Sequence, residues 1–341
     1  MKNVSYILSI VLMLLTVSCS RVERIPTQRE IAIRPMGSPL SKVIAYPENK
    51  VFGVYAFYAD CPAGIPWDDH SAWWASTAYL DSVAFMYNGT YAAGYDMELQ
   101  SHKPYYWPLS GSLLFAGYSP HQGDSNGTID TVNFVLNMSE QIANPYFEID
   151  FRQATSPSEM VDLMWFDVMD VNNGMTVAKS DTPVSLQFKH ALSLVSFEFA
   201  DVHNVYKLVS VVLKDCINTA TFYSGNTAGW MPDITAVEDY VMLEDQNLTL
   251  NQWESEPLYI IPQYLDGIYP TLNGTLDSGV DVVLTFELTD GFGSQLVEIP
   301  LKNYTERWEM GKHYKYTVTV NADPIDFGTP GFTITTQIVA M

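Results

Sequence analysis

The sequence predicts an all-β protein made of sandwiches or barrels, and three observations carry this prediction. The apolar stretches are short, alternate with polar residues and are rich in Val, Ile, Phe, Tyr and Thr, which is typical of strands. Turn-forming pairs such as Asn88-Gly89, Asn126-Gly127 and Asp290-Gly291 separate these stretches. No long window shows a strong helical period. Many short strands joined by turns are typical of sandwiches and barrels.

Candidate strands are spread along the whole chain, at residues 30–34, 51–58, 131–136, 186–199, 206–213, 281–288, 314–320 and 332–339. For one segment, 156–166, the sequence does not distinguish a helix from a strand. Ser156 offers a helix cap with Pro157 at the first helical position, but the apolar run 160–166 suits a strand equally well.

Composition excludes several classes of protein. The chain has 341 residues with 17 basic and 39 acidic side chains, a net charge of −22. An apolar share of 47% is too high for a disordered acidic chain. So few basic residues do not supply the clustered positive surface that nucleic acid or an anionic membrane requires. Three cysteines are too few for a disulfide scaffold or a four-cysteine zinc site.

The amino terminus predicts export. Lys2 precedes an uncharged apolar stretch, 4–17, which has the length of a signal peptide and is too short to span a bilayer. The segment Leu15-Thr-Val-Ser-Cys19 resembles a bacterial lipobox. We therefore expect a signal peptide at 1–18, lipidation of Cys19 and a lipidated tether at 19–27 that anchors the protein to a membrane. The alternative is an ordinary cleaved signal followed by an incidental cysteine.

The rest of the chain divides into two expected domains, because about 100–200 residues are typical of one domain. The boundary fits near Asp181-Thr182-Pro183, after a turn-rich loop and before a new strand. We expect an N-terminal β-sandwich domain at 28–180 and a C-terminal β-sandwich domain at 181–341.

Several motifs, taken together and in order, resemble the fimbrillin-like proteins of the Bacteroidota, which include the subunits of type V pili. They cover nearly the whole chain beyond the signal peptide: Val54-Tyr-Ala-Phe57, Tyr105-Tyr-Trp-Pro-Leu-Ser-Gly-Ser-Leu-Leu-Phe-Ala-Gly-Tyr-Ser-Pro120, Val161-Asp-Leu-Met164, Leu186-Gln-Phe-Lys-His-Ala-Leu192 and Trp308-Glu-Met-Gly-Lys-His-Tyr-Lys-Tyr-Thr-Val-Thr-Val320.

The resemblance implies a fold, a function and partners. The fold would be two tandem transthyretin-like β-sandwich domains after a lipoprotein signal peptide. The protein would be a fimbrial subunit or pilus-associated lipoprotein at the cell surface that supports adhesion and assembles with other fimbrial subunits. A protease would remove the first strand after a basic residue, and the C-terminal strand of the next subunit would fill the groove. Strand addition of this kind gains affinity from main-chain hydrogen bonds and specificity from alternate side chains.

The sequence offers candidates for both steps. Arg34, at the end of the candidate strand 30–34, and Lys42 are the maturation candidates, although Pro35 directly follows Arg34. The donor candidates alternate along the C-terminal strand: Phe332, Ile334, Thr336 and Ile338. An uncharged apolar tail needs burial, and the alternative is that it pairs within its own domain as the last strand.

Nothing in the sequence indicates an enzyme, a cofactor or a metal site. The chain lacks Gly-x-Ser-x-Gly, His-Glu-x-x-His and a phosphate-binding loop, and its six histidines are scattered without ligand spacing. We expect His190, between Phe188 and Leu192, to be a hydrogen-bonded structural residue. The other two cysteines, Cys61 and Cys216, lie in the expected folded domains, and their spacing does not decide whether they form a disulfide.

An alternative function is a glycan-binding surface lipoprotein. Trp73-Trp74, Tyr105-Tyr106-Trp107 and Trp230 would then be exposed platforms for sugar rings. Aromatic residues at this density more often fill sandwich cores, and we expect Trp107 to lie between two sheets.

Overall fold

The computed structural model describes residues 28–36, 50–66, 78–122, 128–135, 146–201, 205–224, 228–250, 253–270, 276–321 and 331–341. Over these residues the chain is almost entirely β-structure. Its helical segments there are short 3₁₀ turns: η3 (Pro157–Glu159), η4 (Val168–Asp170), η5 (Asn172–Gly174) and η7 (Leu301–Asn303). The all-β prediction is therefore confirmed.

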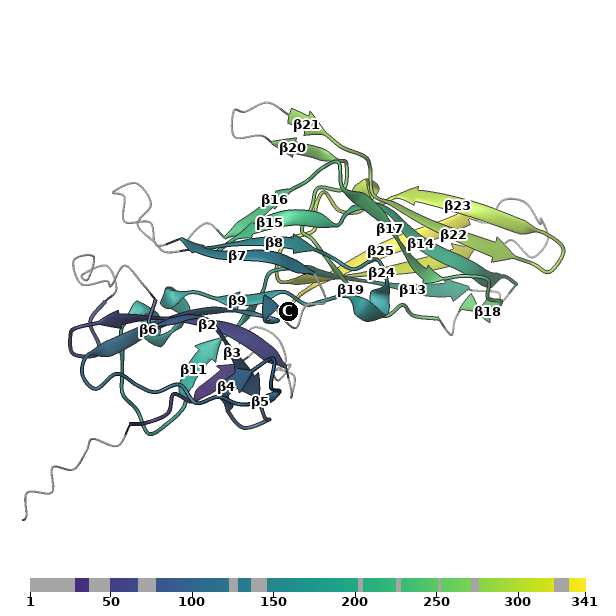
Figure 1. Ribbon diagram of the computed structural model, residues 1–341. Helices are drawn as coiled ribbons and strands as arrows, with labels where there is room; N and C mark the ends of the chain where they lie inside the picture. Colours follow the sequence, from purple (N-terminus) through teal and green to yellow (C-terminus); the bar gives the residue numbers. More distant parts are fainter. Residues whose placement is uncertain are drawn as a thin grey trace, which may run out of the picture.

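The first half of the chain forms a ten-stranded sheet in the order β11-β1-β4-β3-β2-β6-β9-β12, with β5 paired to β4 and β10 paired to β6 (Figure 1). Its strands are β1 (Ile33–Met36), β2 (Val51–Ala59), β3 (Leu80–Tyr87), β4 (Ala92–Asp96), β5 (Ser101–His102), β6 (Ser112–Ser119), β9 (Met164–Phe166), β10 (Val177–Ala178), β11 (Val184–Gln187) and β12 (Lys189–His190). The pairs in this sheet are antiparallel except β1 with β11, which is parallel.

A second sheet joins strands from both halves of the sequence in the order β16-β15-β8-β7. Its strands are β7 (Ile129–Val135), β8 (Tyr146–Arg152), β15 (Thr219–Tyr223) and β16 (Gly229–Pro232). Phe147, Ile149 and Phe222 of this sheet share one buried cluster with Phe57 of β2 and Leu114 of β6. The second sheet therefore covers one face of β2 and β6, while their other face packs in a separate core. Burial on both faces explains why these two strands read as nearly continuous apolar runs.

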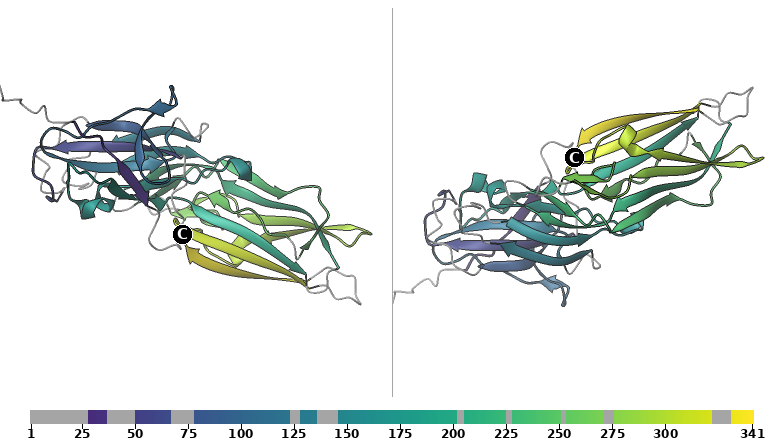
Figure 2. Two further views of the ribbon diagram at one scale, coloured as in Figure 1. Left: turned by 90° about the horizontal axis from the view of Figure 1, so that it is seen from below. Right: turned by 90° about the horizontal axis from the view of Figure 1, so that it is seen from above.

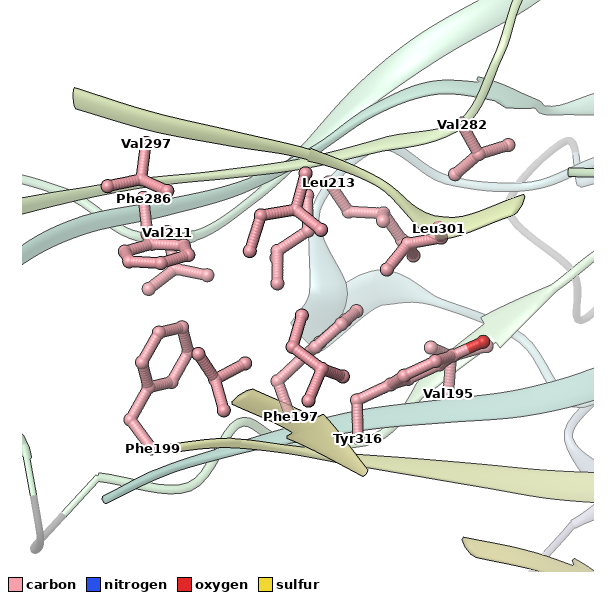
Figure 3. Packing of buried hydrophobic residues seen from close by; sticks show 14 of the residues in the cluster. Val195, Phe197, Phe199, Val211, Leu213, Val282, Phe286, Val297, Leu301 and Tyr316 are labelled. Carbon is pink, nitrogen blue, oxygen red and sulfur yellow. The ribbon is translucent and has the colours of Figure 1, made fainter. Parts of the chain in front are cut away.

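The second half of the chain forms a β-sandwich. One sheet has the order β19-β13-β24-β25 and the other β17-β14-β22-β23, with β18 paired to β14. The strands are β13 (Ser193–Asp201), β14 (Lys207–Ile217), β17 (Val237–Leu243), β18 (Leu248–Thr249), β19 (Leu258–Ile260), β22 (Val283–Thr289), β23 (Ser294–Pro300), β24 (Lys312–Asn321) and β25 (Gly331–Ala340). Figure 3 shows the two layers meeting, with Phe197, Phe199 and Tyr316 facing Val211 and Phe286.

The molecule is elongated, with the ten-stranded sheet and the C-terminal sandwich at opposite ends in both views of Figure 2. The C-terminus lies between them (Figures 1 and 2). A small hairpin, β20 (Ile268–Pro270) and β21 (Leu276–Ser278), projects from the sandwich (Figure 1).

Most strand candidates coincide with observed strands, and one divides. The single candidate 186–199 becomes β11, β12 and β13, because the chain pairs in turn with β1, with β9, and with β19 and β24. The segment 156–166, for which the sequence allowed either a helix or a strand, contains one 3₁₀ turn and then the strand β9. The residues of β9 pair with β6 and β12.

The expected boundary at 180/181 precedes β11 and β12, yet both strands belong to the ten-stranded sheet. Likewise, β15 and β16 pair with β8 rather than with the C-terminal sandwich. The division into domains at 28–180 and 181–341 stays a prediction.

Candidate functional site

The first described strand, β1, is an inserted strand with neighbours on both sides. Ile33 pairs in parallel with Val184 of β11 and in antiparallel with Ala92 of β4. These two partners lie far from β1 in the sequence. The strand is therefore held by non-local contacts.

Backbone hydrogen bonds hold residues 29–36 on both edges. Ile31 N donates to Tyr105 O at 2.7 Å on one edge, and Val184 N donates to Ala32 O at 2.9 Å on the other. Removing this segment would leave buried donors and acceptors without partners, which is unfavourable until another strand supplies them.

The side chains of this segment alternate as expected. Ile31 and Ile33 are fully buried, and both belong to the core cluster that contains Trp107 and Leu186. Pro35 is buried as well, whereas Arg34 points to solvent. The segment therefore fills a row of pockets spaced two residues apart, as the period of a strand requires.

The maturation candidates differ in their surroundings. Arg34 lies inside β1, opposite Ser185 in the parallel ladder, and the peptide bond after it leads to Pro35. Lys42 and the expected lipidation site Cys19 lie outside the described residues.

The C-terminal strand β25 pairs along its full length with β24, from Lys312 opposite Ala340 to Asn321 opposite Gly331. It is an edge strand of its sheet. Met341 N donates to Gly311 O at 2.9 Å, which fixes the end of the strand at the turn before β24. In the isolated chain the tail therefore takes the position of a last strand, the alternative that the sequence left open.

Although β25 is paired, its side chains are poorly buried. Ile334 is only 8% exposed, but Phe332 is 38% and Ile338 is 51% exposed, and Thr336 is half-buried. An uncharged edge strand with apolar side chains in water is a template for pairing with another chain.

The aromatic residues considered as platforms for sugar rings differ in how far they are exposed. Trp107 is buried and packs edge-on against Phe115, which confirms its expected place in the core. Tyr106 is 39% exposed, and Trp230 is half-buried. Trp73 and Trp74 lie outside the described residues.

The sequence interpretation did not identify β11 as the parallel partner of β1. Its residues Val184 and Leu186, with Phe188 beyond it, are buried at alternate positions in the same cluster as Ile31 and Ile33. This alternation was visible in the sequence, but a local pattern does not show which strand is the partner.

His190 lies at the end of β12, where the chain leaves the ten-stranded sheet, and is hydrogen-bonded as expected. Its Nδ1 is 2.8 Å from Oδ2 of Asp162, and its side chain is 8% exposed. Burial lowers the pKa of His190, but the hydrogen bond and the charge of Asp162 outweigh it and leave the pKa above 6.5. Burial, with the charge of Asp162, raises the pKa of the nearby Tyr259 to about 12, so this phenol stays neutral.

Stability should depend on the protonation of His190. Because its pKa is raised in the folded state, the His190–Asp162 pair stabilises the fold fully below the unfolded pKa near 6.5 and loses this contribution as pH rises through the folded pKa. His190→Gln should therefore lower the free energy of unfolding by about 1.5–3 kcal/mol in mild acid and by less in mild base. Guanidinium unfolding across this pH range measures the difference.

A double-mutant cycle provides the control for this prediction. Asp162→Asn should remove the same pH-dependent contribution, and the double variant should lose little more than either single variant. A destabilisation by His190→Gln that is constant across the pH range would contradict the assignment.

Cys61 and Cys216 do not form a disulfide. Cys216 is a free thiol in the core of the C-terminal sandwich, and burial raises its pKa well above 9.0. The sulfur of Cys61 lies 3.6 Å from Ser112 Oγ in the first half of the chain.

Among the residues that the structure describes, no group of three or more His, Cys, Asp or Glu side chains is arranged to hold a metal ion. Within the same residues, no helix has the length and apolar character needed to cross a membrane.

Comparison with known proteins identifies the family. Residues 41–337 match the family model described as fimbrillin-like. The chain is similar to the crystal structures of two suspected cell adhesion proteins, from Bacteroides uniformis (14% identity, TM-score 0.50, 91% of this chain and 98% of that chain) and Bacteroides ovatus (12% identity, TM-score 0.50, 92% and 98%). It is more distantly similar to the tip fimbrial protein Mfa3 from Porphyromonas gingivalis (9% identity, TM-score 0.39, 92% and 100%).

No curated protein matches the sequence. At these low identities, the two Bacteroides structures support the fold alone. The family model is the stronger finding because it spans most of the chain, including β2 through most of β25. The chain belongs to the fimbrillin-like family.

Proposed function

We propose that this protein is a type V fimbrial subunit or pilus-associated lipoprotein that assembles by strand exchange and supports adhesion. One observation carries the proposal: in a member of the fimbrillin-like family, β1 is inserted between β11 and β4 near the start of the chain. The two similar Bacteroides structures are of suspected cell adhesion proteins, and we extend that role to this chain as part of the proposal. The role is structural rather than catalytic.

The acceptor site is the place of β1. Proteolytic removal of the first strand would expose the hydrogen-bonding edges of β11 and β4 and the pockets that Ile31 and Ile33 fill. A strand from another subunit restores both sets of contacts, because main-chain hydrogen bonds do not depend on the identity of the residues. The contact is heterologous, so it extends into an open filament.

The donor is β25 of the next subunit. Its side chains alternate with the period of the pockets, and Phe332 and Ile338 are 38% and 51% exposed in the isolated chain. Transfer into the acceptor groove would bury these two side chains and exchange one ladder of hydrogen bonds for another. Exchange is therefore favoured by the apolar area that only the assembled state removes from water.

Lys42 is the better maturation site of the two candidates. The bond after Arg34 lies within the β1 ladder and precedes the buried Pro35, so a protease would have to open the strand to reach it. A cut after Lys42 would instead release the whole of β1. The new N-terminus would then be Val43.

Lipid attached to Cys19 anchors the precursor in the outer membrane and brings it to the cell surface, where other fimbrial subunits are its partners. Two or three acyl chains hold a protein stably on a membrane, whereas a single chain does so only marginally. After removal of the first strand, the mature subunit no longer carries this anchor.

Mass spectrometry of the native surface form tests the proposal. We expect an acylated Cys19 in the precursor and a mature form that begins at Val43. Cys19→Ala should move the precursor from the membrane pellet to the soluble fraction, whereas Ser20→Ala, one residue beyond, should leave it in the pellet. A Cys19→Ala protein that remains fully in the pellet would refute the lipid anchor. A surface form that still contains β1 would refute removal of the strand.

A further inference from the structure

A cavity of about 230 Å³ lies at the base of the β20–β21 hairpin, between β16 and the segments 262–264 and 307–310. It lies outside the strands proposed for assembly. The side chains that give the cavity its chemistry come from four separate parts of the chain: Trp230, Gln263, Tyr264, Tyr269, Arg307 and Glu309.

The aromatic walls of the cavity are fixed in place. Trp230 donates from Nε1 to Ala191 O at 2.6 Å, and its ring packs against Phe222 with 5.1 Å between the ring centroids. The rings of Tyr264 and Tyr269 are perpendicular to one another, with 5.5 Å between their centroids. These side chains are held before any ligand arrives, which reduces the entropic cost of binding.

The hairpin that carries Tyr269 is tied down at its base. Gly267 has a φ of +66°, and a Cβ at this position would lie 2.6 Å from Val280 O. Tyr269 Oη donates to Tyr264 O at 3.3 Å, which links the first strand of the hairpin to the segment before it. The hairpin projects from the sandwich (Figure 1), and Tyr269 of its first strand lines the cavity.

Charged groups at the cavity are paired with one another. Arg307 donates from Nη2 to Glu309 Oε1 at 2.8 Å and from Nη1 to Tyr264 Oη at 3.2 Å. Glu309 also accepts a hydrogen bond from Lys312, and this bond, with that from Arg307, keeps the pKa of Glu309 below its usual range. The side chains of Arg307 and Glu309 are 49% and 33% exposed, so both can still reach a ligand.

This pairing determines the charge of a suitable ligand. An anion would compete with Glu309 for Arg307 on a chain of net charge −22. A cation would compete with Arg307, which already lies 5.7 Å from the centre of the Tyr264 ring. A neutral ligand with hydroxyl groups faces neither cost, because it can accept from a guanidinium and donate to a carboxylate at once.

The size and walls restrict the ligand further. A cavity of about 230 Å³ is smaller than the roughly 300–1,000 Å³ of pockets for drug-sized ligands and fits one six-membered sugar ring. Such a ring has an apolar C–H face, which packs on aromatic side chains, and a rim of hydroxyls, which needs fixed hydrogen-bonding groups. We propose that this cavity binds one neutral hexopyranose residue, with Trp230 and Tyr269 against its apolar face and Arg307 and Glu309 on its hydroxyls.

Saturation-transfer-difference NMR on the uncleaved chain, which keeps β1, tests this proposal with methyl glycosides of glucose, galactose, mannose and N-acetylglucosamine as probes, and with glucuronic acid as the charged comparator. At least one neutral glycoside should receive saturation through its ring protons, and glucuronic acid should bind more weakly. Arg307→Lys keeps the charge but loses the planar fork and should weaken binding about tenfold.

Variants of Tyr269 separate the aromatic face from the fold. Tyr269→Ala should weaken binding by a similar factor, and Tyr269→Phe, which lacks only the hydroxyl bonded to Tyr264 O, should retain it. Tyr91→Ala provides a matched control, because Tyr91 is a 40% exposed tyrosine in the ten-stranded half of the molecule. Circular dichroism verifies that each variant folds.

Any of the following would overturn the proposal: saturation of none of the glycosides, tighter binding of glucuronic acid, or unchanged binding in both Arg307→Lys and Tyr269→Ala. A change in oligomeric state of Tyr269→Ala would also overturn it, since the cavity would then hold protein. The proposal does not depend on strand exchange, because these variants leave β1 and β25 intact and polymerisation is scored separately.

Discussion

Deleting Phe332–Met341 should abolish polymerisation of the trimmed protein and leave a folded monomer. The deletion removes the proposed donor, so no partner strand is left for the acceptor groove. It leaves the rest of the sandwich in place, because, among the described residues, β25 pairs only with β24 at the edge of its sheet. Trypsin-trimmed protein with the intact tail should form ladders that resist sodium dodecyl sulfate, whereas the truncated protein should run as a monomer.

The monomer should survive this deletion for an energetic reason. Ile334 and Met341 are the side chains of the tail that are well buried, each 8% exposed. Burial of such a side chain contributes about 1.5–3 kcal/mol, against a typical stability of roughly 5–15 kcal/mol. A truncated chain that fails to fold would show that β25 is an integral strand of its own sandwich and not a donor.

Two point variants refine this test. Ile338 and Val339 are neighbours on β25 with exposures of 51% and 49%, so a charge at either position should affect the monomer equally little. Ile338 lies on the alternating set that would enter the groove, whereas Val339 lies on the other face. Ile338→Asp should therefore block ladder formation and Val339→Asp should permit it. Equal behaviour of the two variants would contradict strand exchange in this register.

Trp308→Ala should destabilise the C-terminal sandwich more than any other single change that we predict. Trp308 is 1% exposed in the sandwich core, and its Nε1 donates to Tyr316 Oη at 2.9 Å. Replacing a buried tryptophan by alanine costs about 3–5 kcal/mol, because the transfer free energy is lost and a cavity remains. Guanidinium unfolding followed by circular dichroism measures the loss.

Two comparisons separate packing from hydrogen bonding at Trp308. Tyr316→Phe keeps the ring that stacks on Phe197 but removes the acceptor of the buried indole N–H, at a cost of about 1–3 kcal/mol. Trp253→Ala removes a tryptophan that is only partly buried at the same core and should cost less than Trp308→Ala. Equal losses for Trp253→Ala and Trp308→Ala would contradict the central role of Trp308.

The sequence predicted local features well where one local force dominates. Alternation of apolar residues located β14, β22, β24 and β25, because a strand with one buried face shows a period of two. Gly311, with a φ of +70°, turns the chain before the candidate strand 314–320, in which Tyr314, Tyr316 and Val318 are buried at alternate positions. The family, too, was identified from the order of its motifs, and the family model confirms it.

Long-range pairing was less predictable. The candidate strand 186–199 divides because Leu186, His190 and Val195 pair with three different parts of the chain, and no local period encodes a partner. The cavity at Trp230 shows the same limit. Sequence patterns single out Trp230 as an aromatic residue, but Tyr264, Tyr269 and Arg307 join it only through the folded chain.

The sequence by itself determined that this chain is a β-protein with a composition suited to a folded domain, a cysteine at the end of a signal-like segment, and the ordered motifs of the fimbrillin-like family. Only the tertiary structure decided that β1 pairs with β11, that β8 pairs with β15, and that β25 rests on its own β24. The physical reason is that strand formation is selected by neighbouring side chains, whereas strand pairing is selected by contacts between segments that lie far apart along the chain.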